Sequence, residues 1–245
     1  MKMRTLWFSV LAGCALAGPV SAQLGLPPEC GTLKNAYGPY DYRTSLGTEQ
    51  LHVVEAFHFD SNVENLRKGM SGTLGGDIGY TLRAFPNHHR ALMSMLRLGY
   101  MLKAPKAPGA PFSVVCSLMR AEAFQPEDVM VKVIYGHHLL KQGQRAAALE
   151  KLNVAHASNA KDANVAYNLG LAYFDAGDFS KSLENAHEAY RLGFPLPGLR
   201  DKLKRAGKWK DAPAVVEPAT QGAETPSPAG QPAGSATPEA AGKAN

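Results

Sequence analysis

The sequence has little of what marks a membrane protein or a disulfide-rich scaffold. Its 245 residues include three cysteines and two tryptophans, and aromatic residues make up only 8%. A membrane-spanning helix needs about 20 consecutive apolar residues, and after the N-terminal segment no run reaches that length. We therefore expect no transmembrane segment and a soluble mature chain.

Signatures of catalysis are also missing. The chain has no Gly-x-Ser-x-Gly, phosphate-binding loop, His-Glu-x-x-His or paired-carboxylate motif. Acidic and histidine side chains between Asp41 and Asp77 could supply acid–base chemistry, but nothing in their spacing defines a geometry. The glycine-rich stretch 72–79 could hold an anion at a helix N-terminus, yet a flexible turn between helices is the favoured interpretation. We expect a protein that is not an enzyme.

Neighbouring histidines raise the question of a metal site. Adjacent helical residues point about 100° apart, so neither His88–His89 nor His137–His138 can chelate a metal as residues at i and i+4 would. A site would need histidines from separate elements, such as His58 with His88 or His89. We expect no metal and no cofactor. A metal or small-ligand module built by the N-terminal arm and these histidines is the alternative.

The charge pattern gives little support for a nucleic-acid partner. The net charge is +5, and the basic residues are spread along the chain. The only modest cluster suits the solvated face of a terminal helix, and it consists of Lys202, Lys204, Arg205, Lys208 and Lys210. We expect no nucleic acid to bind.

The N-terminus has the organisation of a secretory signal peptide. Lys2 and Arg4 precede a short apolar stretch, and the small residues 20–22 end at a cleavage site before Gln23. The predicted signal peptide therefore covers 1–22, and the mature protein is periplasmic or secreted. The sequence before Cys14 resembles a lipobox, so a lipoprotein anchored at Cys14 is the alternative.

The predicted export bears on the pairing of the two remaining cysteines. Once Cys14 is removed, Cys30 and Cys116 form an even pair in an oxidising compartment, which favours a disulfide between them. The alternative is one buried and one free thiol. At the other end, residues 211–245 are rich in Ala, Pro, Gly, Ser and Thr without apolar periodicity, which predicts a disordered tail.

Between these ends the sequence repeats itself every 34 residues. Residue types match at this offset in the pairs Tyr135–Gly136 and Leu169–Gly170, Gly143 and Gly177, Leu149 and Leu183, and Ala155 and Ala189. A helical pattern with this period is typical of stacked helical hairpins, each of which buries its apolar face against the next.

The segment YNLGLAYFDAGDFSKSLENAHEAYRLGFP, residues 167–195, resembles a tetratricopeptide repeat (TPR). Leu169, Gly170 and Tyr173 occupy the positions of the first helix of that family, and Pro195 closes the unit. The resemblance is weaker in 129–162. It extends to a longer unit at 89–128, whose six extra residues belong to the proline-rich stretch KAPKAPGAP.

The resemblance implies an all-α fold, an α-solenoid within residues 60–210. We expect about three TPR hairpins at 89–128, 129–162 and 163–196, followed by a capping helix within 197–208. A degenerate helical pair is expected at 63–70 and 77–85. Residues 23–59 are predicted to form an irregular arm, in which the run around Leu51, Val53 and Val54 favours an extended strand. The arm either packs over the first helices, the favoured interpretation, or forms a second recognition surface.

Members of the TPR family grip a peptide or a partner helix on the concave surface of their first helices. Here the resemblance implies a scaffold that binds an envelope protein or peptide, with no oligomeric state specified. The Lys and Asn clamp that some members use for a terminal carboxylate is absent from 129–196. The residues that correspond to the groove are Arg90, Met93, Arg97, Tyr100, Val133, His137, Leu140, Tyr167, Leu171 and Phe174.

Overall fold

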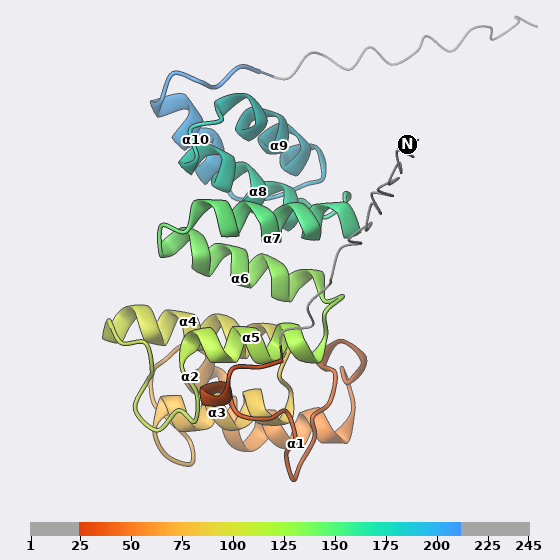
Figure 1. Ribbon diagram of the computed structural model, residues 1–245, viewed down its shortest axis with the longest axis vertical. Helices are drawn as coiled ribbons and strands as arrows, with labels where there is room; N and C mark the ends of the chain where they lie inside the picture. Colours follow the sequence, from red (N-terminus) through yellow and green to blue (C-terminus); the bar gives the residue numbers. More distant parts are fainter. Residues whose placement is uncertain (1–24, 212–245) are drawn as a thin grey trace, which may run out of the picture. The chain divides into compact units, whose positions relative to one another are not determined.

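The computed structural model describes residues 25–211, and in this range the chain forms ten α-helices, two short 3₁₀-helices and no strand (Figure 1). The predicted all-α class is confirmed. The predicted signal peptide, the alternative lipid site at Cys14 and all but the first residue of the predicted tail lie outside the described residues. None of the helices in 25–211 combines the length and the apolar composition that a membrane crossing requires.

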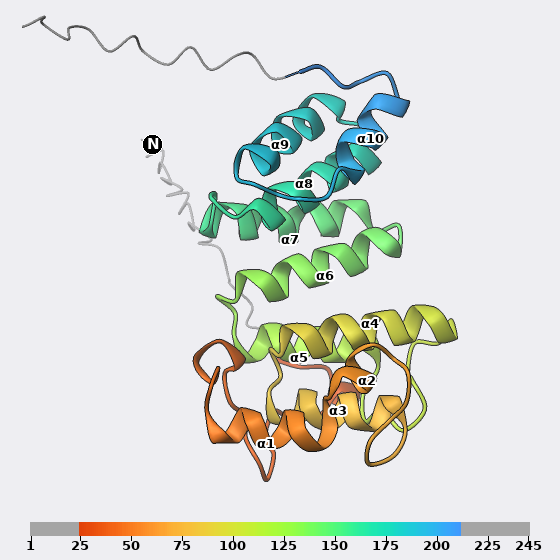
Figure 2. The same ribbon diagram turned by 180° about the vertical axis from the view of Figure 1, so that it is seen from behind.

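The helices from residue 89 onward follow one another in pairs, joined by short turns at 142–144 and 176–178 and by a longer connection over 103–113, as Figures 1 and 2 show. Six of them, α4 to α9, lie in the segments where the sequence predicted hairpins. The 3₁₀-helices are η1 (Pro28–Cys30) and η2 (Tyr42–Thr44). The α-helices are α1 (Glu49–His58), α2 (Ser61–Glu64), α3 (Leu74–Ala84), α4 (His89–Leu102), α5 (Val114–Phe124), α6 (Val129–Lys141), α7 (Arg145–Ser158), α8 (Ala163–Asp175), α9 (Phe179–Arg191) and α10 (Gly198–Arg205).

Local signals set these helix boundaries. Asp128 and Asp162 cap α6 and α8, because each carboxylate accepts hydrogen bonds from backbone N–H groups of the first turn. The hairpins α6–α7 and α8–α9 turn at Gly143 and Gly177, whose φ angles are 74° and 82°. Only glycine adopts this left-handed conformation without a steric cost. Equivalent turns therefore recur at the same offset in the chain.

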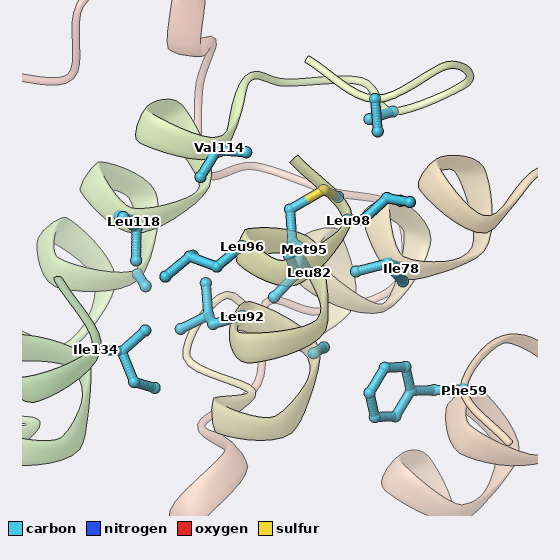
Figure 3. Packing of buried hydrophobic residues seen from close by; sticks show 14 of the residues in the cluster. Phe59, Ile78, Leu82, Leu92, Met95, Leu96, Leu98, Val114, Leu118 and Ile134 are labelled. Atoms are coloured by element: carbon cyan, nitrogen blue, oxygen red, sulfur yellow. The ribbon is translucent and has the colours of Figure 1, made fainter. Parts of the chain in front are cut away.

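The largest core cluster surrounds α4. Leu92, Met95 and Leu96 of this helix are at most 1% exposed and meet Ile78 of α3 and Leu118 of α5 (Figure 3). A second cluster joins α6, α7 and α8, and a third buries the apolar face of α10 against α8 and α9. Consecutive helices thus bury their apolar faces against the next pair, which is what holds a chain of short helices together.

The glycine-rich stretch 72–79 differs from the expected flexible turn, because α3 already begins at Leu74. A Cβ on Gly75 would lie 2.4 Å from the carbonyl oxygen of Pro108, and one on Gly79 would lie 2.3 Å from Cδ of Pro111. The hydroxyl of Thr73 donates a hydrogen bond to the same Pro108 oxygen at 2.9 Å. The glycines therefore let the proline-rich connection between α4 and α5 lie directly on α3.

Two expectations for the first 70 residues are wrong. The run 51–54 lies in helix α1 and not in a strand, because Leu51 and Val54 are one turn apart and both pack on Phe85 and Ala84. The helix expected over 63–70 is reduced to the single turn α2. Its continuation is a loop that the buried carboxylate of Asp77 holds by accepting hydrogen bonds from backbone N–H groups of 70 and 71.

The predicted disulfide between Cys30 and Cys116 is confirmed, and it joins η1 to α5. Next to it the guanidinium of Arg120 donates hydrogen bonds to the carbonyl oxygens of Cys30 and Thr32, at 3.0 and 2.6 Å. The tyrosines of the arm pack on α1 and α3 beside Phe85. The arm is thus part of the packed structure.

Candidate functional site

A hollow of about 500 Å³ opens between the first helices of three successive hairpins. We call it the inter-hairpin hollow. Its walls combine apolar side chains with arginines, histidines and asparagines. They are Glu64 of α2, His89, Arg90, Met93 and Arg97 of α4, Met130, Val133, Ile134 and His137 of α6, and Asn164 and Asn168 of α8.

Helical spacing explains why these side chains meet. Residues three or four apart lie on one face of a helix, and each helix contributes such a series. Arg90, Met93 and Arg97 form the series of α4, and Val133 and His137 continue it on α6. On α4 the neighbouring residues Leu92, Met95 and Leu96 face the core, whereas Val133 of α6 is itself buried and belongs to both the core and the wall.

Ion pairs occupy one rim of the hollow. The Arg90 guanidinium binds both carboxylate oxygens of Glu64, with Nε 2.8 Å from Oε1, and also lies 3.2 Å from Oε1 of Glu55. Arg90 holds the pKa of the Glu64 carboxyl below its usual range, and Glu64 raises the pKa of Arg90 in return. Arg90 therefore already has its counter-charges.

Arg97 lies about two turns further along α4 and is exposed. Its Nη2 donates to the backbone carbonyl of Glu64 and to the hydroxyl of Ser94, the latter at 3.0 Å. Among the residues that the structure describes, no carboxylate forms an ion pair with it. These two contacts hold the guanidinium at the hollow while its charge remains available to an anionic group.

The two histidines of the hollow have different surroundings. Burial, assisted by the nearby charge of Lys141, lowers the pKa of His137, which is therefore neutral at pH 7. His89 has its Nε2 at 2.9 Å and 3.0 Å from the two carboxylate oxygens of Asp128. The wall thus carries one neutral imidazole and one that is tied to a buried carboxylate.

Beneath the hollow a polar network joins the arm to two hairpins. The side-chain amide of Asn87 donates to Asp41 at 2.7 Å and to Asp128 at 2.9 Å, and its oxygen accepts from the backbone N–H of Tyr42. The hydrogen bond from Arg43 lowers the pKa of Asp41 to about 2. Burial raises the pKa of Asp128, but hydrogen bonds from His89 and Asn87 outweigh burial and lower it overall. The network fixes the start of α4 relative to α6.

His88 connects this network to α1. Its ring is fully buried between Tyr42, 4.1 Å away by ring centroid, and Phe59. Nδ1 accepts the N–H of Ala91 and so caps α4, and Nε2 lies 3.0 Å from the carboxylate of Glu55. This arrangement places the proton of a neutral ring on Nε2. Burial lowers the pKa of His88, which keeps the ring neutral.

Half of the predicted groove residues line the hollow, namely Arg90, Met93, Arg97, Val133 and His137. The hydroxyl of Tyr100 instead turns to His138, 2.9 Å from Nδ1, and Leu140 packs against the cluster around Leu152. The last three predicted groove residues are Tyr167, Leu171 and Phe174. They pack against Leu199 and Leu203 of α10. The binding role of all ten remains a prediction.

The hollow also contains residues that sequence reasoning missed. Glu64 comes from α2, and Asn168 and His89 lie beside positions that the repeat pattern did select. A signal for His89 existed, because it opens α4 directly after the Pro-Asn junction. No sequence pattern places Glu64 opposite Arg90, because the position of the single-turn helix α2 depends on tertiary contacts.

The histidines considered for a metal site have separate partners. Nδ1 of His58 lies 3.1 Å from Asp77, while His88 binds Glu55 and His89 binds Asp128. Within residues 25–211 no three His, Cys, Asp or Glu side chains are grouped so that they could hold a metal ion. The structure therefore does not bring His58 together with His88 or His89 as ligands.

Comparison with known proteins adds no family. No protein-family model matches the chain. No curated protein matches it either.

Proposed function

We propose that this chain is an exported α-solenoid of the TPR type that binds a segment of another envelope protein in the inter-hairpin hollow. The proposal rests on the 34-residue repeat of the sequence, on the signal-peptide pattern and on the hollow itself. The disulfide between Cys30 and Cys116 is consistent with an oxidising compartment. Binding without catalysis is the proposed activity.

The observation that carries the proposal is the composition of the hollow. Met93 and Met130 offer flexible apolar surface that adapts to different side chains. Arg97 adds a cation without a carboxylate partner among residues 25–211. Arginine and methionine are enriched where proteins contact one another. The segment that fits has an apolar side chain for the methionines and an acidic group for Arg97.

Charge reversal at Arg97 tests this proposal. The mature protein, tagged after Lys210, is used to capture partners from the envelope fraction of the native host. Arg97→Glu is expected to lose the partner that the wild-type protein captures, because it places a like charge opposite an acidic group.

Arg205→Glu is the matched control, since Arg205 is an exposed arginine at the end of α10 outside the hollow. It is expected to capture the partner as well as the wild-type protein does. Equal recovery by Arg97→Glu and the wild-type protein would refute binding in the hollow. Circular dichroism of both variants verifies that the helices are retained.

A further inference from the structure

A second cavity lies between α4 and α6, at the opposite ends of these helices. It has a volume of about 570 Å³ and shares no lining residue with the inter-hairpin hollow. We call it the connection cavity, because Lys103, Ala104 and Pro105 of the α4–α5 connection form one of its walls. Val114 of α5 and Leu139 of α6 contribute apolar surface.

The cavity exists where the first hairpin departs from the 34-residue period. The six extra residues lengthen the connection between α4 and α5, which carries the chain around the end of α4. The middle of this connection is anchored, since Ala107 and Ala110 are buried in the main core and Thr73 binds the carbonyl of Pro108. Packing on α3 therefore holds the wall in place, and the cavity is preformed.

A partly buried polar pair marks one side of the cavity. The hydroxyl of Tyr100 lies 2.9 Å from Nδ1 of His138, and the imidazole is only 5% exposed. In residues 25–211 the other ring nitrogen, Nε2, has no hydrogen-bond partner. Such a nitrogen is costly to bury unless a polar group binds it, so an occupant needs a hydrogen-bonding group at this side.

The mouth of the cavity combines a cation with apolar surface. Lys103 lines the cavity from the left-handed position that ends α4, and within the described range its ammonium forms no ion pair with a carboxylate. Gln142, which directly follows α6, adds a polar side chain to the lining. Beside the mouth, Val115 is 42% and Met101 is 58% exposed.

We propose that the connection cavity binds a medium-chain carboxylic acid. The alkyl chain lies against Val114 and Leu139, and the carboxylate reaches Lys103 at the mouth, on a lining that also includes the polar side chain of His138. A purely polar ligand would leave the apolar wall uncovered. A hydrocarbon would leave the His138 nitrogen and the Lys103 ammonium without partners. Binding here is independent of a protein partner in the inter-hairpin hollow.

Calorimetric titration of the mature protein with octanoate and, separately, with 1-octanol tests the proposal. Octanoate is expected to bind saturably with one site per chain and more tightly than 1-octanol. Lys103→Gln is expected to weaken the affinity for octanoate by about twofold to fivefold, the range of an exposed ion pair. The affinity for 1-octanol should stay unchanged.

A variant that fills the cavity provides a second test of the proposal. Ala104→Phe places a ring in the volume of the alkyl chain and is expected to weaken octanoate by about tenfold or more, because close-packed sites do not accommodate both. Ala176→Phe, at the exposed turn after α8, is the matched control and retains full affinity. Val115→Trp, at the mouth, replaces Ala104→Phe if thermal unfolding shows that the latter is not folded.

The proposal is overturned if the wild-type protein shows no saturable octanoate binding, or if a folded filling variant binds octanoate as tightly as the wild-type protein. Tighter binding of 1-octanol than of octanoate, or unchanged octanoate affinity in Lys103→Gln, would contradict the assignment of the carboxylate.

Discussion

The two halves of the described chain are stabilised in different ways. From α6 onward, the hairpins repeat a simple pattern of capped helices, glycine turns and small apolar contacts. From residue 25 to α5, the chain relies on a disulfide, hydrogen bonds to the buried Asp128 carboxylate and aromatic–histidine stacking. A repeated sequence needs few special contacts, because each unit buries the next. An irregular arm has to be fixed by individual long-range contacts.

The largest effect on the free energy of unfolding is expected from loss of the disulfide, which lies entirely within the irregular half. Cys30 and Cys116 are separated by 86 positions, and a cross-link over a loop of this length is worth about 4–5 kcal/mol by the chain-entropy estimate. Reduction should lower the free energy of unfolding in urea accordingly. Hydrogen exchange of the reduced protein should speed up in η1 and α5 and stay slow in α8 and α9.

A Cys30→Ser/Cys116→Ser double variant is the control, because its stability should not respond to reductant. If reduction left the unfolding free energy of the wild-type protein unchanged, the contrast between the two halves would lose its main support.

A smaller effect is expected from Asp128, where the two halves meet. Asp128→Ala removes the cap of α6 and the acceptor for both Asn87 and His89. We expect a loss of about 2–3 kcal/mol, since hydrogen bonds to a charged group and a helix cap are each worth one to a few kcal/mol. Asp128→Asn keeps a capping oxygen and should lose about half as much. Urea unfolding of both variants measures the difference, and equal stability of Asp128→Ala and the wild-type protein would contradict the coupling role.

The smallest effect on stability is expected from a change of pH. It involves histidines of both halves. The pKa values of His88, His137 and His138 are lowered from 6.5 by burial. Below pH 6.5 the unfolded chain therefore binds more protons than the folded one, and stability falls as the pH falls. The pKa of Asp41 is about 2, against 3.8 in its unperturbed state. Its contribution is present above pH 3.8 and is lost as the pH falls through 2.

Urea unfolding at pH 7.5, 5.5 and 3 measures this dependence. The midpoint should decrease at each step, and Asp41→Asn should flatten the decrease between the two lower pH values. A midpoint that is constant from pH 7.5 to 5.5 would contradict the neutral, buried state of these histidines.

The same contrast explains how far the sequence could predict the molecule. The segments that hold the helix pairs from α4 to α9 could be predicted from the periodicity, and the Cys30–Cys116 pair from the predicted export signal and an even count. Helix α1 was missed because its β-branched residues have a local preference for strands, while Phe85 selects the helix through packing. Glycines in α3 suggested flexibility, but their role depends on Pro108 and Pro111, which lie more than thirty positions away.

The residues of the candidate site also differ in how well the sequence predicts them. Helical spacing placed Arg90, Met93 and Arg97 on one face, and the repeat aligned Val133 and His137 with them. It could not show that α10 covers Tyr167, Leu171 and Phe174, since apolar residues at the end of an array look the same whether a partner or a capping helix covers them. The hydrogen bond between Tyr100 and His138 could not be predicted either, because it joins side chains from two separate helices.

Site-specific photo-crosslinking in the native host tests the central claim most directly. A benzophenone amino acid replaces Met93, which is 36% exposed in the inter-hairpin hollow, or Val154, which is 46% exposed on α7. We predict a discrete crosslinked product of defined mass from position 93, lost when Arg97→Glu is added, and no such product from position 154. The same product from both positions, or none from position 93 under conditions where the tagged protein captures a partner, would contradict binding in the hollow.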